Sequence, residues 1–506
     1  MHLHRCLSLI IVLMTGNTAS ALEAETIDRI SGRLDAYHAG HDSSDSPELR
    51  VVYFHAAGTP PQKEYEARLH RILTDIQAFY SSEMERLGFA GKSLPLELRN
   101  GDLVVHRVQG REPINAYSND TVTSKKIIAD TRSHLASTID VERDFILFIC
   151  GLCSQLENGS YAFNSPYFGM PGLSPRGGMC FAADCEMQDT LHYSDEESRF
   201  VYREHLGKFD KTLGAFNRLY IGGIAHELGH GLGLPHTKEY PWQKPRIGTA
   251  LMGSGNHTWR EELFGKKGSF LTLSSGMRLL SHPLFTRSNR DRFVKVKASA
   301  SSLRFQAGKQ AKLNVSGRLN ATPQAYAVLV DTDPEGNSDY NTNTWVGEVS
   351  EKGDFTVPIY HLQNGTNELR ITALHMNGST TRINRMPFQV NDGHPLSLNE
   401  LNHQWAFEQA ELAYMDDRME DLQQLVEKAT LEGDSSRLGP LQHLSELATG
   451  QPEPKSLTES EETSAYLSDV RWREATVGWG QPARNHYFTT QQVRDGVCLM
   501  PGGKFH

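Results

Sequence analysis

The sequence predicts a mixed α/β (α+β) domain over residues 48–292, a β-sandwich over 293–396, a helical hairpin over 397–449 and a short β-rich module at the end. Three patterns predict this order: strands alternating with helices, then short β-branched runs between turn residues, then a return to helical periodicity. The 506 residues are 38% hydrophobic and 22% charged, a foldable composition long enough for roughly three or four domains.

The first 21 residues have the pattern of a secretory signal peptide. A weakly basic start precedes an apolar run from Cys6 to Met14, and Ala19-Ser20-Ala21 matches a small-residue cleavage site. A buried first strand or helix is the alternative interpretation. Cleavage would start the mature chain near Leu22, so we expect a secreted protein, extracellular or periplasmic.

The composition of the remaining chain excludes two kinds of partner. No later run approaches the roughly 20 apolar residues of a transmembrane helix, so no membrane span is expected in the mature chain. The net charge is -10 and no dense Lys/Arg stripe occurs, which excludes a nucleic-acid partner. Residues 22–47 are polar and predict a loose N-terminal arm; the sequence does not distinguish a plain arm from a propeptide.

The predicted α/β domain starts with a strand over 49–54. Pro60-Pro61 precedes an amphipathic helix from about 62 to 87, whose apolar residues recur at helical spacing: Tyr65, Leu69, Ile72, Ile76 and Tyr80. Further strands are expected at 94–98, where Pro95 permits an edge strand at best, and at 103–108. The wholly apolar run 145–149 predicts a buried strand, and a second helix is expected over 213–231.

Five cysteines remain after Cys6, and four of them are close in the sequence: Cys150, Cys153, Cys180 and Cys185. In an oxidising compartment these four predict two disulfides, for which three pairings are possible. A structural zinc ion held by four thiolates is the alternative. Cys498 is left without an expected partner in this chain.

The segment from His226 to His236 reads H-E-x-x-H-x-x-G-x-x-H. On a helix, His226 and His230 leave the same face one turn apart, so both can reach one Zn2+ ion. Gly233 permits a sharp exit from the helix with positive φ, which brings His236 round as the third ligand. Three protein ligands leave a coordination position open, as in catalytic zinc sites. Glu227 lies beside the ligands and is the expected general base for a zinc-activated water.

This motif resembles that of the metzincin clan of zinc endopeptidases. The segment around Met252 (Leu251-Met252-Gly253-Ser254) is similar to the clan's Met-turn, which implies that Met252 forms an apolar floor under the three imidazoles. The resemblance covers about residues 48–290. It also implies an edge strand, expected within 168–181, that pairs with an extended substrate.

The predicted β-sandwich contains one candidate calcium loop. Asp331-Thr332-Asp333-Pro334-Glu335-Gly336 resembles the start of such a loop, but position twelve is Thr342 and not Glu. A bound Ca2+ ion is therefore weakly supported, and a solvated turn is the favoured interpretation.

The C-terminal part contains a helical spacer, a linker and an unfinished module. Helical periodicity runs from 397, is broken at Gly433-Asp434-Ser435-Ser436 and resumes at about 437–448. Residues 450–464 form a Pro/Glu/Ser/Thr linker. The segment 465–506 contains Ala475-Thr476-Val477-Gly478-Trp479-Gly480 and resembles the start of an NPCBM carbohydrate-binding module. The resemblance implies a carbohydrate ligand and a truncated β-sandwich, as in a fragment of a longer protein.

The sequence therefore predicts a secreted zinc endopeptidase with a protein or peptide substrate, directed to glycoproteins or carbohydrate-rich surfaces. The alternative is a carbohydrate-binding or adhesion protein with an inactive metzincin domain. The intact Glu227 and three histidines argue against that alternative. A glycosidase needs a carboxylate pair in a sugar cleft, and no sequence pattern nominates one.

Overall fold

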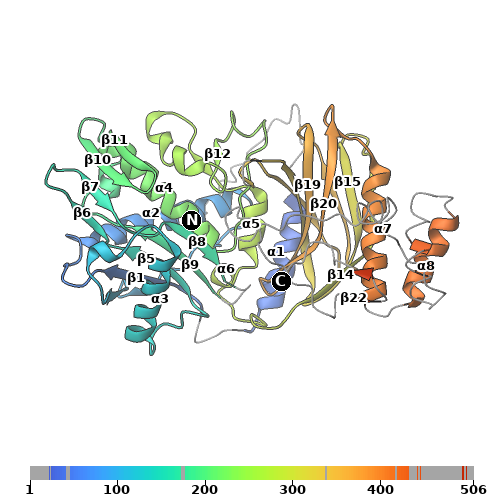
Figure 1. Ribbon diagram of the computed structural model, residues 1–506, viewed down its shortest axis with the longest axis horizontal. Helices are drawn as coiled ribbons and strands as arrows, with labels where there is room; N and C mark the ends of the chain where they lie inside the picture. The colour runs from blue at the N-terminus through green and yellow to red at the C-terminus, as the bar shows by residue number, and fades with distance from the viewer. Residues whose placement is uncertain are drawn as a thin grey trace, which may run out of the picture.

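The structure is a computed structural model that describes residues 22, 24–41, 46–172, 177–336, 339–415, 419–431, 441–442, 445, 493–494 and 497–498. Within these residues an α/β domain is followed by a β-rich domain and then by helices (Figure 1). The predicted mixed α/β domain and β-rich second domain are thereby confirmed at this level. Among the described helices, none is long and apolar enough to cross a membrane.

The α/β domain is built on a five-stranded sheet with the order β4-β1-β5-β9-β8. Neighbouring strands β4, β1, β5 and β9 are parallel, and β8 pairs antiparallel with β9 at one edge. The strand bounds are β1 Leu49–His55, β4 Val105–Gln109, β5 Phe145–Cys150, β8 Phe168–Pro171 and β9 Gly178–Ala183. Strand β5 is buried along its whole length, as its apolar sequence predicts.

Helices cover both faces of this sheet. One face packs on α2 (Tyr65–Arg86) and α4 (Leu213–Gly231) through a shared core that includes Leu69, Leu147 and Ile224. The other face packs on α3 (Thr121–Leu135), which is capped by Asp120 at Thr123 N. The α3 helix is absent from the prediction because its few apolar residues give little helical periodicity.

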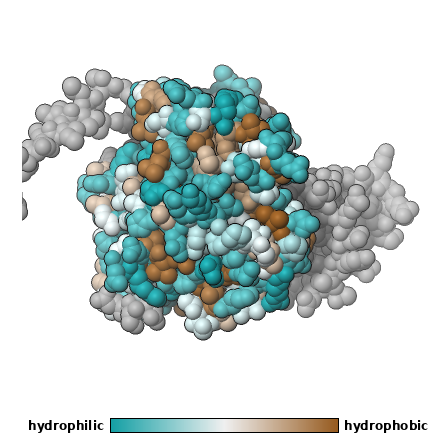
Figure 2. Space-filling model, turned by 90° about the vertical axis from the view of Figure 1, so that its left-hand side faces the viewer, coloured by the Kyte–Doolittle hydropathy of each residue, from teal (hydrophilic) through white to brown (hydrophobic). Residues whose placement is uncertain are grey.

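A smaller four-stranded sheet, with the order β11-β10-β7-β6, lies beside the main one. Its bounds are β6 Cys153–Gln155, β7 Tyr161–Phe163, β10 Arg199–Glu204 and β11 Gly207–Thr212. The remaining elements of the domain are β2 Leu98–Arg99, β3 Asp102–Leu103, β12 Thr249–Ala250, β13 Ser269–Phe270, α5 Leu273–Leu280 and α6 Pro283–Thr286, with short 3-10 turns between them. The end of the molecule that this domain forms is mainly hydrophilic, with its apolar groups in small, separate patches (Figure 2).

The N-terminal arm is a helix and not the loose segment that its polar composition predicts. Helix α1 (Ala24–His38) lies between the two domains, with Ile30 and Leu34 buried (Figure 1). Arg29 forms a bidentate ion pair with Glu348 of the β domain, at 2.8 and 2.5 Å. Apolar residues one helical turn apart and these interdomain contacts stabilise α1, although its exposed faces remain polar.

The second domain, here called the β domain, consists of two sheets that share one hydrophobic core. The first sheet has the order β14-β15-β18 and the second has the order β17-β16-β19-β20-β21. Their bounds are β14 Lys297–Gln306, β15 Leu313–Thr322, β16 Ala325–Pro334, β17 Asn343–Glu348, β18 Asp354–Ile359, β19 Gly365–His375, β20 Thr380–Asn391 and β21 His394–Pro395. All pairings in both sheets are antiparallel.

Two helices follow the β domain, α7 (Leu398–Met415) and α8 (Met419–Leu431). Both fall within the stretch for which the sequence predicts one helix before the Gly433 break. Most of the predicted second helix at 437–448 lies outside the described residues. So do the signal peptide, the linker and nearly all of the NPCBM-like segment, in which only two short strands, β22 Val493–Arg494 and β23 Val497–Cys498, are described.

The four clustered cysteines are buried free thiols, so the expectation of two disulfides is wrong for this structure. Side chains along a strand alternate between the two faces of the sheet, which explains why Cys150 and Cys180 do not form a disulfide with each other. Strand register pairs Cys180 with Leu147, and both belong to the core beneath α2 and α4, whereas Cys150 points to the α3 side. Cys153 and Cys185 belong to a separate core between the five-stranded and the four-stranded sheets of the α/β domain, and both are also free thiols.

Candidate metal centre

Helix α4 carries the first half of the His226–His236 segment through the centre of the α/β domain. Thr212 caps its N-terminus by accepting a hydrogen bond from Ala215 N at 3.1 Å. The helix is buried on nearly all sides, and the Tyr80 hydroxyl of α2 donates to Ala225 O at 2.9 Å. Its bounds, 213–231, match the sequence prediction. The rigid surroundings fix the directions in which His226 and His230 point.

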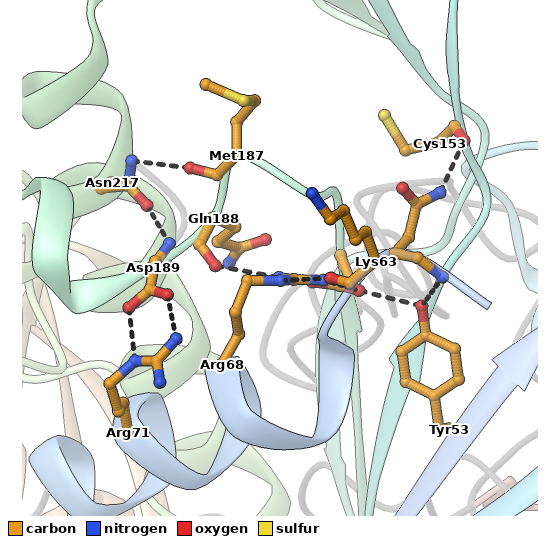
Figure 3. A network of polar contacts seen from close by, with 11 residues as sticks. Tyr53, Lys63, Arg68, Arg71, Cys153, Met187, Gln188, Asp189 and Asn217 are labelled. Carbon is orange, nitrogen blue, oxygen red and sulfur yellow. Dashed lines mark hydrogen bonds and ion pairs between the residues drawn. The ribbon is translucent and has the colours of Figure 1, made fainter.

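A polar network at the start of α4 sets the position of the helix relative to α2. Asn217 accepts from Asp189 N at 2.7 Å and donates to Met187 O at 3.1 Å. The Asp189 carboxylate pairs with Arg71 of α2 at 2.9 and 2.5 Å (Figure 3). The loop after β9 thus connects the two helices by hydrogen bonds that are largely buried, which favours one fixed arrangement.

The chain leaves α4 at Gly233, which has a φ of 80° as predicted. Gly233 N donates to His230 O and Leu234 N donates to Gly229 O, both at 2.9 Å, which ends the helix in a tight turn. Because the turn reverses the chain direction, the three predicted ligands meet, although they come from a helix and a loop. His226, His230 and His236 form the one cluster among the described residues whose donor atoms lie within 4.8 Å of one another.

The donor set of this cluster fits a zinc ion. His226 Nδ1 lies 2.6 Å from Leu251 O and His230 Nδ1 lies 2.8 Å from Leu234 O, so Nδ1 carries the proton in both rings. Each Nε2 is then a lone-pair donor, yet His230 Nε2 is 3.2 Å from His226 Nε2 and 3.1 Å from His236 Nε2. Tetrahedral zinc with bonds of about 2.05 Å needs nitrogens about 3.3 Å apart. The observed Nε2–Nε2 distances are therefore close to the nitrogen separation that a shared zinc ion needs.

Burial favours the neutral form of His226 and His230, as metal ligation requires. It lowers the pKa of His226 to about 3, with the neighbouring His230 adding to the effect, and it also lowers the pKa of His230. His226 is 4% exposed, and the other two rings are partly buried.

Met252, for which the sequence predicts an apolar floor under the imidazoles, is buried against helix α4 at Gly229, between His226 and His230 in the sequence. The Met252 side chain is 1% exposed and packs so closely on α4 that a Cβ at Gly229 would lie 2.4 Å from its sulfur. The same segment holds the ligands through its backbone, because Leu251 O accepts from His226 and Met252 O accepts from Thr237 N at 3.1 Å. Met252 and its neighbours therefore support the ligands without contributing a polar side chain.

The Glu227 side chain reaches strand β8. Its carboxylate accepts a hydrogen bond from Gly169 N at 2.9 Å. Burial raises the pKa of Glu227 to about 7, although the Gly169 hydrogen bond opposes the shift. A carboxyl group with a pKa near neutrality suits proton transfer in both directions. Sequence reasoning missed Gly169, since one glycine in a short strand carries no recognisable pattern.

The β domain supplies one wall of the site. The Tyr340 ring, in the connection between β16 and β17, stacks on the His236 imidazole with centroids 3.8 Å apart and an interplanar angle of 30°. Burial and the nearby Glu227 charge raise the pKa of Tyr340. Lys238 N donates to Thr342 O at 2.7 Å just beyond the third histidine. No sequence signal marks Tyr340, because the contact joins residues more than 100 positions apart.

The candidate calcium loop is organised around an arginine in this structure. The Arg370 guanidinium lies 3.3 Å from Asp333, 3.0 Å from Asp339 and 3.8 Å from Asp331. Arg370 is 8% exposed, so its positive charge sits among these carboxylates in a buried setting. The Asp331–Gly336 segment lies largely within strand β16 and does not form a separate loop.

The fold is similar to that of OgpA from Akkermansia muciniphila. A crystal structure of wild-type OgpA matches with a TM-score of 0.57 and 23% identity, covering 70% of this chain and 96% of that one. Catalytically inactive OgpA in complex with an O-glycopeptide substrate, glycodrosocin, matches with a TM-score of 0.56 and 24% identity, covering 68% and 93%. No protein-family profile and no curated protein matches the chain. At these identities the similarity establishes a shared fold.

Proposed function

We propose that the protein is a zinc-dependent endopeptidase that cleaves glycoproteins. One observation carries the proposal: the Nε2 atoms of His226 and His236 lie 3.2 and 3.1 Å from His230 Nε2, next to a carboxyl group with a pKa of about 7. His226, His230 and His236 would hold the metal, and Glu227 would be the acid-base group. The metzincin-like motif and Met252 agree with this assignment.

The metal and the residues around it would have separate roles in peptide hydrolysis. A zinc ion supplies a Lewis acid, which polarises the scissile carbonyl and makes water more acidic. Glu227 accepts a proton from the attacking water as the oxygen bonds to the carbonyl carbon. It then returns that proton to the nitrogen as the C–N bond breaks. The Gly169 N–H orients the Glu227 carboxylate through both steps.

Strand β8 provides a place for an extended substrate. It is the last strand in the order β4-β1-β5-β9-β8, so no other described strand pairs with its outer edge in that sheet. Gly169, on this strand, bonds to Glu227, so a peptide added along the edge would pass close to the acid-base group. Backbone pairing of this kind binds peptides with little dependence on side chains.

The substrate class follows from the similarity to OgpA, which has been crystallised with an O-glycopeptide substrate. We infer that this chain likewise cleaves peptides that carry O-linked glycans. The signal-peptide-like N-terminus supports secretion to a compartment where glycoproteins occur. The NPCBM-like segment supports an additional carbohydrate ligand that would hold the enzyme near such substrates.

The test uses the full chain and a matched pair of peptides with and without one O-linked glycan. Mass spectrometry of the products should reveal cleavage of the glycopeptide, suppression by a zinc chelator and recovery on adding zinc. Glu227→Gln, which preserves size and removes the base, should bind zinc and lose activity by at least about 100-fold. Equal cleavage by Glu227→Gln would contradict the peptidase assignment, and equal cleavage of both peptides would contradict the glycan requirement. If chelator-sensitive cleavage is absent from the wild type, the protein is a binding protein instead.

A further inference from the structure

An aromatic ring of the β domain, that of Tyr340, contacts the candidate metal centre at His236. Tyr340 is 43% exposed, which is high for an aromatic side chain of a folded domain. One of its faces lies on the His236 imidazole, at a centroid distance of 3.8 Å. The ring therefore combines close packing against a proposed metal ligand with an open side that faces solvent.

The backbone around Tyr340 is anchored, so the ring has a fixed place. Asp339, the preceding residue, accepts from Arg370 Nη1 at 3.0 Å. Thr342 accepts from Arg370 Nη2 at 3.2 Å through its hydroxyl and from Lys238 N at 2.7 Å through its carbonyl. Arg370 belongs to β19, in the centre of the larger sheet of the β domain. These bonds connect Tyr340 both to the sheet and to the chain just after His236.

His236 differs from the other two histidines in its position in the fold. His226 and His230 lie on a buried helix, and each donates Nδ1–H to a backbone carbonyl of the α/β domain. His236 follows the turn at Gly233 and lies outside any helix or strand. An imidazole on a loop can rotate about its side-chain bonds, and a stacked ring restricts this rotation.

We infer that Tyr340 is a positioning residue, whose ring holds the His236 imidazole in the orientation needed to share one zinc ion with His226 and His230. The β domain thereby completes the metal centre of the α/β domain. This inference rests on the zinc site of the proposed function but not on the identity of the substrate. Groups that orient metal ligands from outside the coordination shell contribute about 10- to 100-fold to metal affinity or activity.

The experiment measures zinc affinity of the full chain by competition with a chelating indicator dye. Tyr340→Phe keeps the ring and should bind zinc within about twofold of wild type. Tyr340→Ala removes the stack and should bind zinc about 10- to 100-fold more weakly. Phe293→Ala is the matched control, because Phe293 is another exposed aromatic ring, at 40%, and contacts Arg143 and Arg292 instead. It should bind zinc as wild type does.

Cobalt substitution provides a readout of geometry apart from activity. The visible absorption spectrum of the Co2+ form should be unchanged in Tyr340→Phe and altered in Tyr340→Ala. Thermal melts of the zinc-free proteins should coincide, since the ring is largely outside the core.

Two outcomes would overturn the inference. Wild-type zinc affinity in Tyr340→Ala would show that the stack does not orient His236. An equal loss of zinc affinity in Tyr340→Phe would show that the hydroxyl group, and not the stacked ring, supports zinc binding. A wild-type protein that binds zinc but does not cleave peptides refutes the proposed function alone, and the variants then still test the positioning role.

Discussion

Strand β8 approaches helix α4 closely at Gly169, and Gly169→Ala tests this contact directly. A Cβ built there lies 1.9 Å from Glu227 O, 2.7 Å from His230 Cβ and 2.8 Å from Gly231 N. All three atoms belong to α4, which is held on several sides. The backbone at Gly169 needs no positive φ, so steric overlap is the only cost of the methyl group.

The required movement can be estimated from these distances. Real Cβ contacts stay above 3.0 Å, so β8 must retreat from α4 by about 1.1 Å. That shift would lengthen the 2.9 Å hydrogen bond from Gly169 N to Glu227 beyond useful range. Overpacking of this kind destabilises proteins by about 1–3 kcal/mol. A displacement of about 1 Å at a catalytic group lowers activity by about 100-fold.

Two measurements on purified Gly169→Ala check this reasoning. Urea unfolding should give the loss of stability, and kcat/KM on a fluorogenic glycopeptide should give the loss of activity, while zinc content stays at the wild-type level. Gly32→Ala is the matched control, because no atom lies within 4 Å of its added Cβ and its φ is not positive. Wild-type stability and activity in Gly169→Ala would refute the close contact between β8 and α4.

Two further predictions concern buried titratable groups. Burial and the nearby Arg292 charge lower the pKa of His282 to about 3, so the unfolded chain binds more protons below pH 6.5 and acid destabilises the fold. Lowering the pH from 7 to 5 should therefore reduce the free energy of unfolding, measured with urea, by about 2 kcal/mol through His282. The variant His282→Asn, which can still cap Leu284 N, should remove this loss. The same pH dependence of the unfolding free energy in wild type and variant would contradict the prediction. Burial raises the pKa of Cys150, Cys153 and Cys180. A thiol reagent at pH 8 should therefore leave these three cysteines unlabelled in the folded protein and label them once denaturant is added. Rapid labelling without denaturant would show that solvent reaches these cores.

Local patterns in the sequence predicted the central strand of the α/β domain and the helix that carries His226 and His230. The helix over 213–231 and the strand over 145–149 follow from periodicity and from an unbroken apolar run, both of which act between near neighbours. The turn at Gly233 follows from the conformational freedom of glycine, and its φ of 80° agrees. These features depend on a few adjacent residues, so they can be derived without tertiary structure.

Other features depend on contacts between distant segments. The residues Ile27, Ile30, Leu34 and Tyr37 have helical spacing, a signal that could have identified α1, but their packing into a core with residues of both domains was not apparent from a polar segment. The clustering of Cys150, Cys153, Cys180 and Cys185 in the sequence suggested two disulfides, whereas the register of β5 and β9 puts Cys150 and Cys180 on opposite faces of the sheet. Tyr340 reaches His236 only because the two domains pack together.

The central claim is that His226, His230 and His236 bind one zinc ion with an open coordination position beside Glu227. Anomalous diffraction measured at the zinc edge on crystals of the full chain tests this most directly. We expect one peak about 2.0–2.1 Å from all three Nε2 atoms, with no fourth protein ligand. The absence of a peak there after growth with zinc, or a fourth protein ligand that closes the site, would contradict it.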